Sequence, residues 1–191
     1  MKTVFCIGDS NTWGYTDTAC YNGRYPAGVR WTSLIREEGF RVIDDGINGR
    51  MIPGEAESAE IAERVSGYSP CTVIIMLGTN DVIGGMSAAA CGCKMDILIR
   101  TLKKDSGNTL ILTAPVPVEN GSWGAGKEAI RQSGLLPEIY AAIAENNGIL
   151  LADAAHWGIT VGPDGVHFDE KSHSVFARKM LKILKTAAET V

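Results

Sequence analysis

Residues 72–77 read TVIIML, a continuous apolar run that is followed directly by Gly78-Thr79-Asn80-Asp81. Such a run is typical of a parallel strand that is covered on both faces of its sheet. Further short apolar runs along the chain predict strands at residues 3–7, 41–44, 109–113 and 149–152. The sequence therefore predicts a buried sheet of five strands.

Longer segments of helical period alternate with these strands. We expect helices at about residues 31–38, 56–66, 88–103, 136–146 and 171–188. The last segment places Phe176, Met180 and Leu184 on one face with lysines opposite. Alternation of this kind implies right-handed crossovers and a three-layer α/β/α sandwich around a parallel sheet. We predict the flavodoxin-like strand order 2-1-3-4-5, in a single domain over residues 1–191.

The composition narrows the class of protein. Apolar residues make up 45% of the 191 residues, charged residues make up 21%, and the net charge is −4. With no basic run, a nucleic-acid partner is not expected. No apolar stretch reaches membrane-spanning length, and the N-terminal run is too short for a signal peptide, so we expect a cytoplasmic protein without a membrane span. Cys91 and Cys93 lack the second pair that a zinc site needs, so no metal and no cofactor are predicted.

Polar, glycine-rich clusters follow four of the predicted strands. They are Gly8-Asp9-Ser10-Asn11, the segment from Gly46 to Arg50, the segment from Gly78 to Asp81, and residues 153–167. Ligands of such sheets bind beyond the carboxyl ends of the strands. In the order 2-1-3-4-5, strands two and three flank strand one, so Gly49 and Asn80 should lie on either side of Ser10.

A serine with suitable neighbours can act as a nucleophile. Its hydroxyl needs an adjacent base, and the negative charge that develops on the substrate needs hydrogen-bond donors. Ser10 follows a glycine-marked turn and should begin a helical turn, so its own N–H can be one donor. The N–H of Gly49 and the side-chain amide of Asn80 can supply two more. These groups predict an oxyanion hole around Ser10.

Two histidines could serve as the base. Asp164-Gly165-Val166-His167 and Asp153-Ala154-Ala155-His156 share the Asp-x-x-His spacing, in which the carboxylate can orient the imidazole. Strand five should lie about 14 Å from strand one, and residues 153–163 are long enough to span this distance when extended. We favour His167 over His156, because His167 ends a long loop just before the last helix. His173 should be solvated.

Further side chains could contact a substrate. Trp13 is the best pocket candidate among the aromatic residues, which also include Tyr15, Trp123 and Trp157. Trp31 should pack its helix against the sheet. Arg50 could meet an anionic substrate, although a lone arginine after a turn is usually solvated.

Each cluster also has a purely structural interpretation. Asp9 or Ser10 could cap a helix, and Gly-Thr-Asn-Asp is common in turns. A non-catalytic, flavodoxin-like module could hold a flavin or phosphate at the same edge, although the first cluster lacks the Ser/Thr and Gly donors that cradle a phosphate. A carbohydrate-binding module stays open as well. The occurrence of all four clusters together favours the enzyme.

Taken together, the clusters resemble the SGNH, or GDSL-type, hydrolase superfamily, and are most similar to its arylesterase and acyltransferase branch. The first block of the family resembles residues 8–14, with Asn11 in place of the leucine of the GDSL name. The oxyanion glycine matches Gly49, with Gly46 as the less favoured register. The Gly-x-Asn-Asp block matches the segment that contains Asn80, and the Asp-x-x-His block matches Asp164 and His167.

The resemblance implies a cofactor-free ester hydrolase that forms an acyl-enzyme on Ser10. The small-molecule substrate implied is a short-chain carboxylic ester or an O-acetyl ester, with acyl transfer as a side activity. A homo-oligomer is left open, because the loop at residues 114–127 is short.

Overall fold

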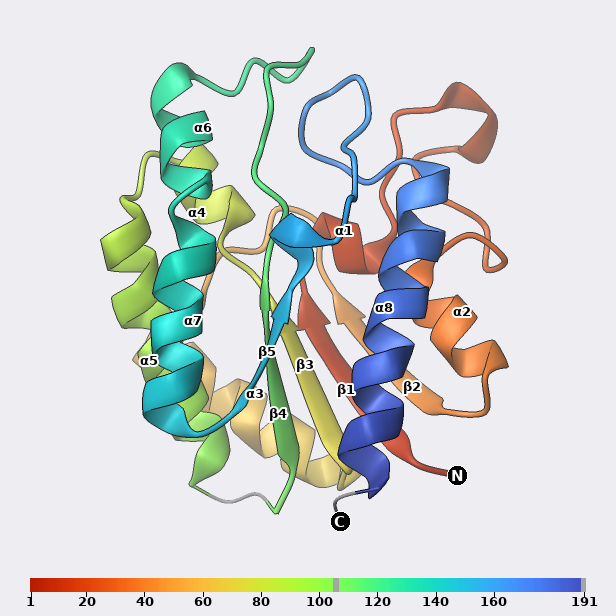
Figure 1. The fold of residues 1–191 in the computed structure, drawn as a ribbon, viewed down its shortest axis with the longest axis vertical. Coiled ribbons are helices and arrows are strands. Elements are labelled where there is room, and N and C mark those ends of the chain that lie inside the picture. Colours follow the sequence, from red (N-terminus) through yellow and green to blue (C-terminus); the bar gives the residue numbers. More distant parts are fainter. Residues whose placement is uncertain (105–106, 190–191) are drawn as a thin grey trace.

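The computed structural model describes residues 1–104 and 107–189. Its strands form a parallel sheet in the order β2-β1-β3-β4-β5 (Figure 1), as predicted. The strands are β1 (Thr3–Gly8), β2 (Arg41–Gly46), β3 (Thr72–Met76), β4 (Thr109–Ala114) and β5 (Leu150–Asp153). Each lies within two residues of the bounds expected from the apolar runs.

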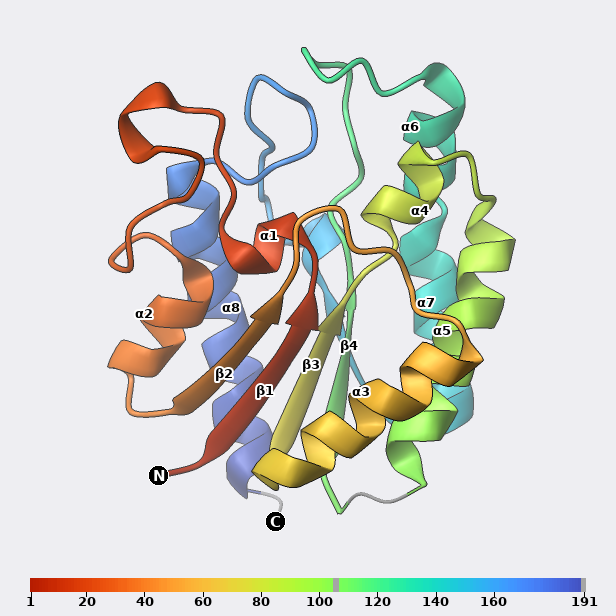
Figure 2. The same ribbon diagram turned by 180° about the vertical axis from the view of Figure 1, so that it is seen from behind.

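Helices cover both faces of this sheet. Those expected from the sequence are α2 (Trp31–Glu37), α3 (Glu55–Tyr68), α5 (Ala88–Lys103), α7 (Leu136–Asn147) and α8 (Glu170–Glu189). Helices α2 and α8 lie on one face, and α3, α5 and α7 lie on the other (Figures 1 and 2). The prediction of a three-layer α/β/α sandwich is confirmed.

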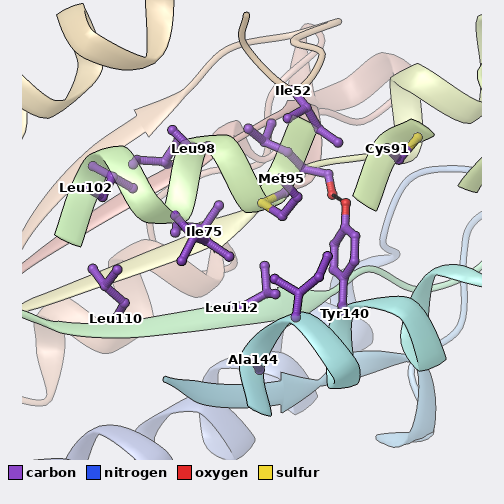
Figure 3. Close-up of a cluster of buried hydrophobic side chains, with 14 of the residues drawn as sticks. Ile52, Ile75, Cys91, Met95, Leu98, Leu102, Leu110, Leu112, Tyr140 and Ala144 are labelled. Atoms are coloured by element: carbon purple, nitrogen blue, oxygen red, sulfur yellow. Dashed lines mark hydrogen bonds between the residues drawn. The ribbon is translucent and has the colours of Figure 1, made fainter. Parts of the chain in front are cut away.

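Alternation along the strands divides the core into two clusters. Val73 and Ile75 of β3 belong to the cluster that includes side chains of α3, α5 and α7. Ile74 and Met76 point to the opposite face, into the cluster formed with α2 and α8. Figure 3 shows the first cluster, in which side chains of α5 and α7 meet those of β3 and β4. Both faces of β3 are buried, which explains its continuous apolar sequence.

The carboxyl ends of the central strands are aligned. Gly8 at the end of β1 pairs with Gly46 of β2 and with Met76 of β3. All strands are parallel, so the segments that follow β1, β2, β3 and β5 emerge at one edge, which lies at the top of Figure 1. The polar clusters identified in the sequence are brought to this edge.

Short helices near this edge were not expected beyond the turn at Ser10. The expected turn is α1 (Ser10–Trp13), and the others are α4 (Thr79–Ile83), α6 (Lys127–Ser133), and the 3-10 helices at Ala19–Tyr21 and Ala154–His156. In the part of the chain that the structure describes, no helix combines the length and apolar character needed to cross a bilayer. Of the two cysteines in α5, Cys91 is buried and Cys93 is exposed.

Candidate active site

Ser10 begins α1 just beyond the carboxyl end of β1. Asp9 caps this helix, because its Oδ1 accepts a hydrogen bond of 2.9 Å from the N–H of Asn11. The helix packs closely on β2. A Cβ atom placed on Gly46 would lie only 2.4 Å from the backbone nitrogen of Trp13. Glycine at position 46 therefore allows the close approach that holds Ser10 at the edge of the sheet.

The loop before α8 brings Asp164 and His167 to Ser10. The Nε2 atom of His167 lies 2.8 Å from Ser10 Oγ, and its Nδ1 lies 2.6 Å from Asp164 Oδ2. The other carboxylate oxygen of Asp164 accepts hydrogen bonds from the N–H groups of Val166 and His167, at 2.8 and 2.9 Å. All three side chains of this triad are buried. Such an arrangement can move a proton from the hydroxyl to the imidazole while the carboxylate fixes the tautomer.

Burial and hydrogen bonding set the charges of the triad. Burial alone would raise the pKa of Asp164, but the N–H groups of His167 and Val166, together with the imidazole, outweigh it and lower that pKa. Burial lowers the pKa of His167, and the carboxylates of Asp164 and Asp17 offset only part of this shift. At neutral pH, Asp164 is therefore ionised, and His167 is neutral and able to accept the proton of Ser10.

The two further donors predicted for an oxyanion hole lie in connected segments. The side-chain Nδ2 of Asn80, in α4, donates a hydrogen bond of 3.0 Å to the carbonyl oxygen of Arg50. Gly49 has a φ of 74°, which suits glycine, and its position leaves open space where a side chain would stand. The N–H of Gly46 instead donates to Asp44 Oδ1 at 3.2 Å. Because that donor is already engaged, the geometry favours Gly49 over Gly46 as the donor.

Asp81 also holds the segment that contains Gly49. The buried carboxylate of Asp81 accepts a hydrogen bond of 2.8 Å from the N–H of Ile52. Its other oxygen lies 3.5 Å from Lys94 Nζ. Asn80 and Asp81 thus hold the segment after β2 through consecutive side chains.

The alternative histidine lies in a different environment. His156 Nδ1 lies 2.6 Å from Asp153 Oδ2, so this pair repeats the spacing and the contact of Asp164 and His167. However, the His156 side chain is 75% exposed, whereas that of His167 is 4% exposed. The hydroxyl of Ser10 is bonded to His167, as described above. The structure therefore places His167, the histidine that the sequence favoured, beside Ser10.

The prediction that His173 is solvated is wrong. Its side chain is fully buried in the first turn of α8, where Nδ1 accepts a hydrogen bond of 3.4 Å from the N–H of Trp31. The rings of Tyr25 and Phe168 pack against it. Burial lowers the pKa of His173 to about 3, so this residue is a neutral part of the core.

The residues predicted to contact substrate have protein partners. Arg50 is buried, and its Nη1 lies 2.9 Å from Asp45 Oδ2, so the expectation of a solvated side chain is wrong. Substrate contact by Arg50 stays a prediction, although its guanidinium already has a carboxylate partner. Trp13 is half-buried, and the guanidinium of Arg24 lies 4.5 Å from the centre of its ring. A role for Trp13 in binding also stays a prediction.

Two other aromatic side chains lie against the imidazole of His167. The ring centres of Tyr15 and Trp123 are 4.3 and 4.9 Å from that of His167. Trp123 is 54% exposed, so its indole can meet solvent or a ligand. The sequence marked both as possible cleft residues but gave no reason to place Trp123 at His167, because that contact depends on how the 115–126 segment folds over the loop before α8. Its backbone does so through hydrogen bonds such as Glu119 N–H to Gly165 O, at 2.8 Å.

A small cavity borders the triad on the side of the segment after α1. Its volume is about 130 Å³, and its walls include His167, Asp17, Thr18, Tyr25 and Asp169. Asp164 lines it too, so three aspartates border the space beside the imidazole. Negative charge on aspartates in these walls favours neutral or cationic groups over anions.

This geometry agrees with comparisons with known proteins. Residues 6–175 match the model of the GDSL-like lipase/acylhydrolase family. No curated protein sequence matches the chain. The solved structure of M. smegmatis aryl esterase is similar, with 21% identity and a TM-score of 0.88, over 98% of this chain and 100% of that one.

Two further solved structures show the same fold over nearly their whole length. A carbohydrate acetylesterase family member from Sinorhizobium meliloti has 22% identity and a TM-score of 0.85, over 98% of this chain and 99% of that one. A protein from Agrobacterium tumefaciens, described as a candidate arylesterase, has 26% identity and a TM-score of 0.86, over 98% of this chain and 100% of that one. The resemblance drawn from the four sequence blocks is confirmed. The chain belongs to the GDSL-like lipase/acylhydrolase family, whose enzyme class is that of the carboxylic ester hydrolases.

Proposed function

We propose that the chain hydrolyses esters through an acyl-enzyme formed on Ser10. The observation that carries the proposal is the contact of 2.8 Å between His167 Nε2 and Ser10 Oγ, with Asp164 on the other ring nitrogen. In the first step, His167 takes the hydroxyl proton as Oγ attacks the ester carbonyl carbon. Asp164 stabilises the resulting imidazolium.

The oxyanion is held by three donors, and the reaction then proceeds in two halves. The N–H groups of Ser10 and Gly49 and the amide of Asn80 hydrogen-bond the negative oxygen. As the tetrahedral intermediate collapses, His167 gives its proton to the alkoxy oxygen, and the alcohol leaves. Water then loses a proton to His167 and attacks the acyl carbon. The acid is released, and the proton returns to Ser10.

For the substrate, we propose a neutral, short-chain carboxylic ester or an O-acetyl ester. The names of two similar structures, an aryl esterase and a carbohydrate acetylesterase, support this class. The small cavity with Asp17 and Asp169 in its walls supports a neutral substrate rather than an anionic one. Transfer of the acyl group to an alcohol in place of water, assembly into a homo-oligomer and a cytoplasmic location stay predictions.

The test is hydrolysis of p-nitrophenyl acetate, butyrate and octanoate, and of acetylated xylose, by the purified protein. We expect acetate to be cleaved with the highest kcat/KM, and Ser10→Ala to remove nearly all turnover. Added alcohol should yield a new ester if acyl transfer occurs. A protein that cleaves none of these esters but binds the sugar would favour the carbohydrate-binding alternative, and a coloured protein with bound flavin would favour the flavodoxin-like one.

A further inference from the structure

The side chain of Asn11 bridges the residues on either side of His167. Its Oδ1 accepts a hydrogen bond of 2.8 Å from the N–H of Phe168, and its Nδ2 donates one of 3.2 Å to the carbonyl oxygen of Val166. Asn11 directly follows Ser10 in α1. One side chain therefore connects the helix of the nucleophile to the chain immediately before and after the base.

Asn11 is itself held rigidly. Its N–H donates to Asp9 Oδ1 at 2.9 Å, and its carbonyl oxygen accepts a hydrogen bond of 3.0 Å from the indole Nε1 of Trp31. The side chain is buried, so its bonds are shielded from competing water. With its backbone fixed on both sides, Asn11 transmits the position of α1 to the loop that it contacts.

The loop depends on these bonds for its local geometry. The Val166 side chain packs with Val118 and Ala129, and the Phe168 ring packs 5.6 Å from that of Phe176. These contacts secure the side chains of Val166 and Phe168 in separate clusters, one on each side of His167. The backbone between them would have an unpaired buried N–H and an unpaired buried C=O without Asn11, and such groups are costly to leave unpaired.

The side-chain amide makes both bonds because it carries a donor and an acceptor in one planar group. Leucine, which stands at this position in the GDSL signature, has neither. A carboxylate keeps the acceptor for the Phe168 N–H but would face the Val166 carbonyl with a second acceptor. The residue that departs from the family signature is thus the one that ties the base to the nucleophile.

We infer that Asn11 is a positioning residue that keeps the His167 imidazole within hydrogen-bonding distance of Ser10 Oγ. The inference rests on the proposed esterase function for its kinetic consequence, but the bridge itself can be measured without activity. Displacement of a catalytic group by about 1 Å can cost about 100-fold in rate. Loss of the bridge should therefore lower kcat rather than weaken substrate binding.

The test compares Asn11→Leu and Asn11→Asp with a matched control, Ser172→Ala. The hydroxyl of Ser172, in α8, likewise bonds one N–H and one C=O of this loop: it accepts from the Thr160 N–H at 3.1 Å and donates to the Thr160 carbonyl at 2.8 Å. Ser172→Ala therefore leaves an equal set of backbone groups unpaired, several residues before the triad. Each variant is assayed for Tm, for kcat and KM on p-nitrophenyl acetate, and for hydrogen exchange of the Phe168 amide.

We expect Asn11→Leu to lower kcat by about 10- to 100-fold with KM within about twofold of wild type, and to speed exchange of the Phe168 amide. Asn11→Asp should retain much of the exchange protection, because it keeps the acceptor, yet lose kcat. If Asn11→Leu does not fold, Asn11→Asp still tests the inference. Ser172→Ala should lower Tm but keep kcat. Equal losses of kcat in Ser172→Ala, or wild-type kcat in folded Asn11→Leu, would overturn the inference.

Failure of the proposed function is distinguishable from failure of the bridge. If the wild-type protein cleaves no ester, the esterase proposal fails, and amide exchange still decides whether Asn11 holds the loop. Exchange of the Phe168 amide that is unchanged in Asn11→Leu would refute the bridge, whatever the activity.

Discussion

The side-chain amide of Asn80 donates a hydrogen bond of 3.0 Å to the carbonyl oxygen of Arg50, the residue that follows Gly49. An amide nitrogen carries two hydrogens, so one can hold the segment after β2 while the other is available to a substrate oxygen. Asn80 can thus both supply a donor and hold the segment that supplies another.

Replacement of Asn80 should therefore affect the transition state more than the fold. We expect Asn80→Ala to lower kcat about 100- to 1000-fold, the range found for loss of one oxyanion donor. Steady-state kinetics on p-nitrophenyl acetate measures the change. Asn147→Ala is a matched control, because that amide bonds Asp96 and the Ile143 carbonyl at the far end of α7. If both variants lost activity equally, Asn80 would have no special role as a donor.

The two Asp-x-x-His pairs should behave differently on mutation. His167→Ala should remove nearly all turnover, because Ser10 loses its base, whereas His156→Ala should keep it, because that exposed ring does not bond Ser10. Asp164→Asn should cost less than His167→Ala, since the imidazole remains. Wild-type turnover in His167→Ala together with loss in His156→Ala would reverse the assignment.

The pH dependence of activity should follow His167. Burial lowers the pKa of this imidazole below 6.5 in the folded protein, although Asp164 offsets part of the shift. The protonated ring cannot accept the Ser10 proton, so kcat/KM should fall as the pH drops through a value below 6.5 and stay level above it. A pH–rate profile on a substrate that does not titrate checks this. An inflection clearly above 6.5 would contradict the burial of a neutral base.

The free energy of unfolding should depend on the protonation of Asp9. Burial raises the pKa of its carboxyl from 3.8 to about 7, and the hydrogen bond from the Asn11 N–H offsets only part of the shift. The folded state therefore holds the proton more tightly than the unfolded chain. The resulting contribution to the free energy of unfolding is complete below the unfolded pKa and is lost as the pH rises through about 7.

Urea unfolding between pH 5 and 8 measures this contribution. Asp9→Asn keeps an oxygen for the Asn11 N–H and has no charge to bury. We expect the free energy of unfolding of wild type to fall relative to that of Asp9→Asn as the pH rises across this range. Parallel curves for the two proteins would show that Asp9 does not titrate near pH 7.

Much of the fold was accessible from the sequence because its signals are long. Strand β3 is a continuous apolar run, and α5 and α7 span three or more turns, so their periodicity is visible. Helix α4 has five residues, which is too short for a period to emerge. The interpretation as a single domain stays a prediction.

The sequence predicted those residues of the candidate site that are marked by their position or spacing along the chain. Position after a strand indicated Ser10, Gly49 and Asn80, but equal spacing could not separate His167 from His156, since burial decides between them. His173 was misjudged because a polar residue beside serines reads as exposed, whereas it lies on the buried face of α8 with Phe176. The bridge from Asn11 spans more than 150 positions, and no local pattern predicts it.

Covalent labelling by a fluorophosphonate tests the central claim most directly, because the reagent reacts only with a serine whose proton is removed by a neighbouring base. We predict a single adduct, located on Ser10 by peptide mass spectrometry, that is absent from Ser10→Ala, forms far more slowly in His167→Ala and is unchanged in His156→Ala. A wild-type protein that stays unlabelled, or an adduct that persists in Ser10→Ala, would contradict the account.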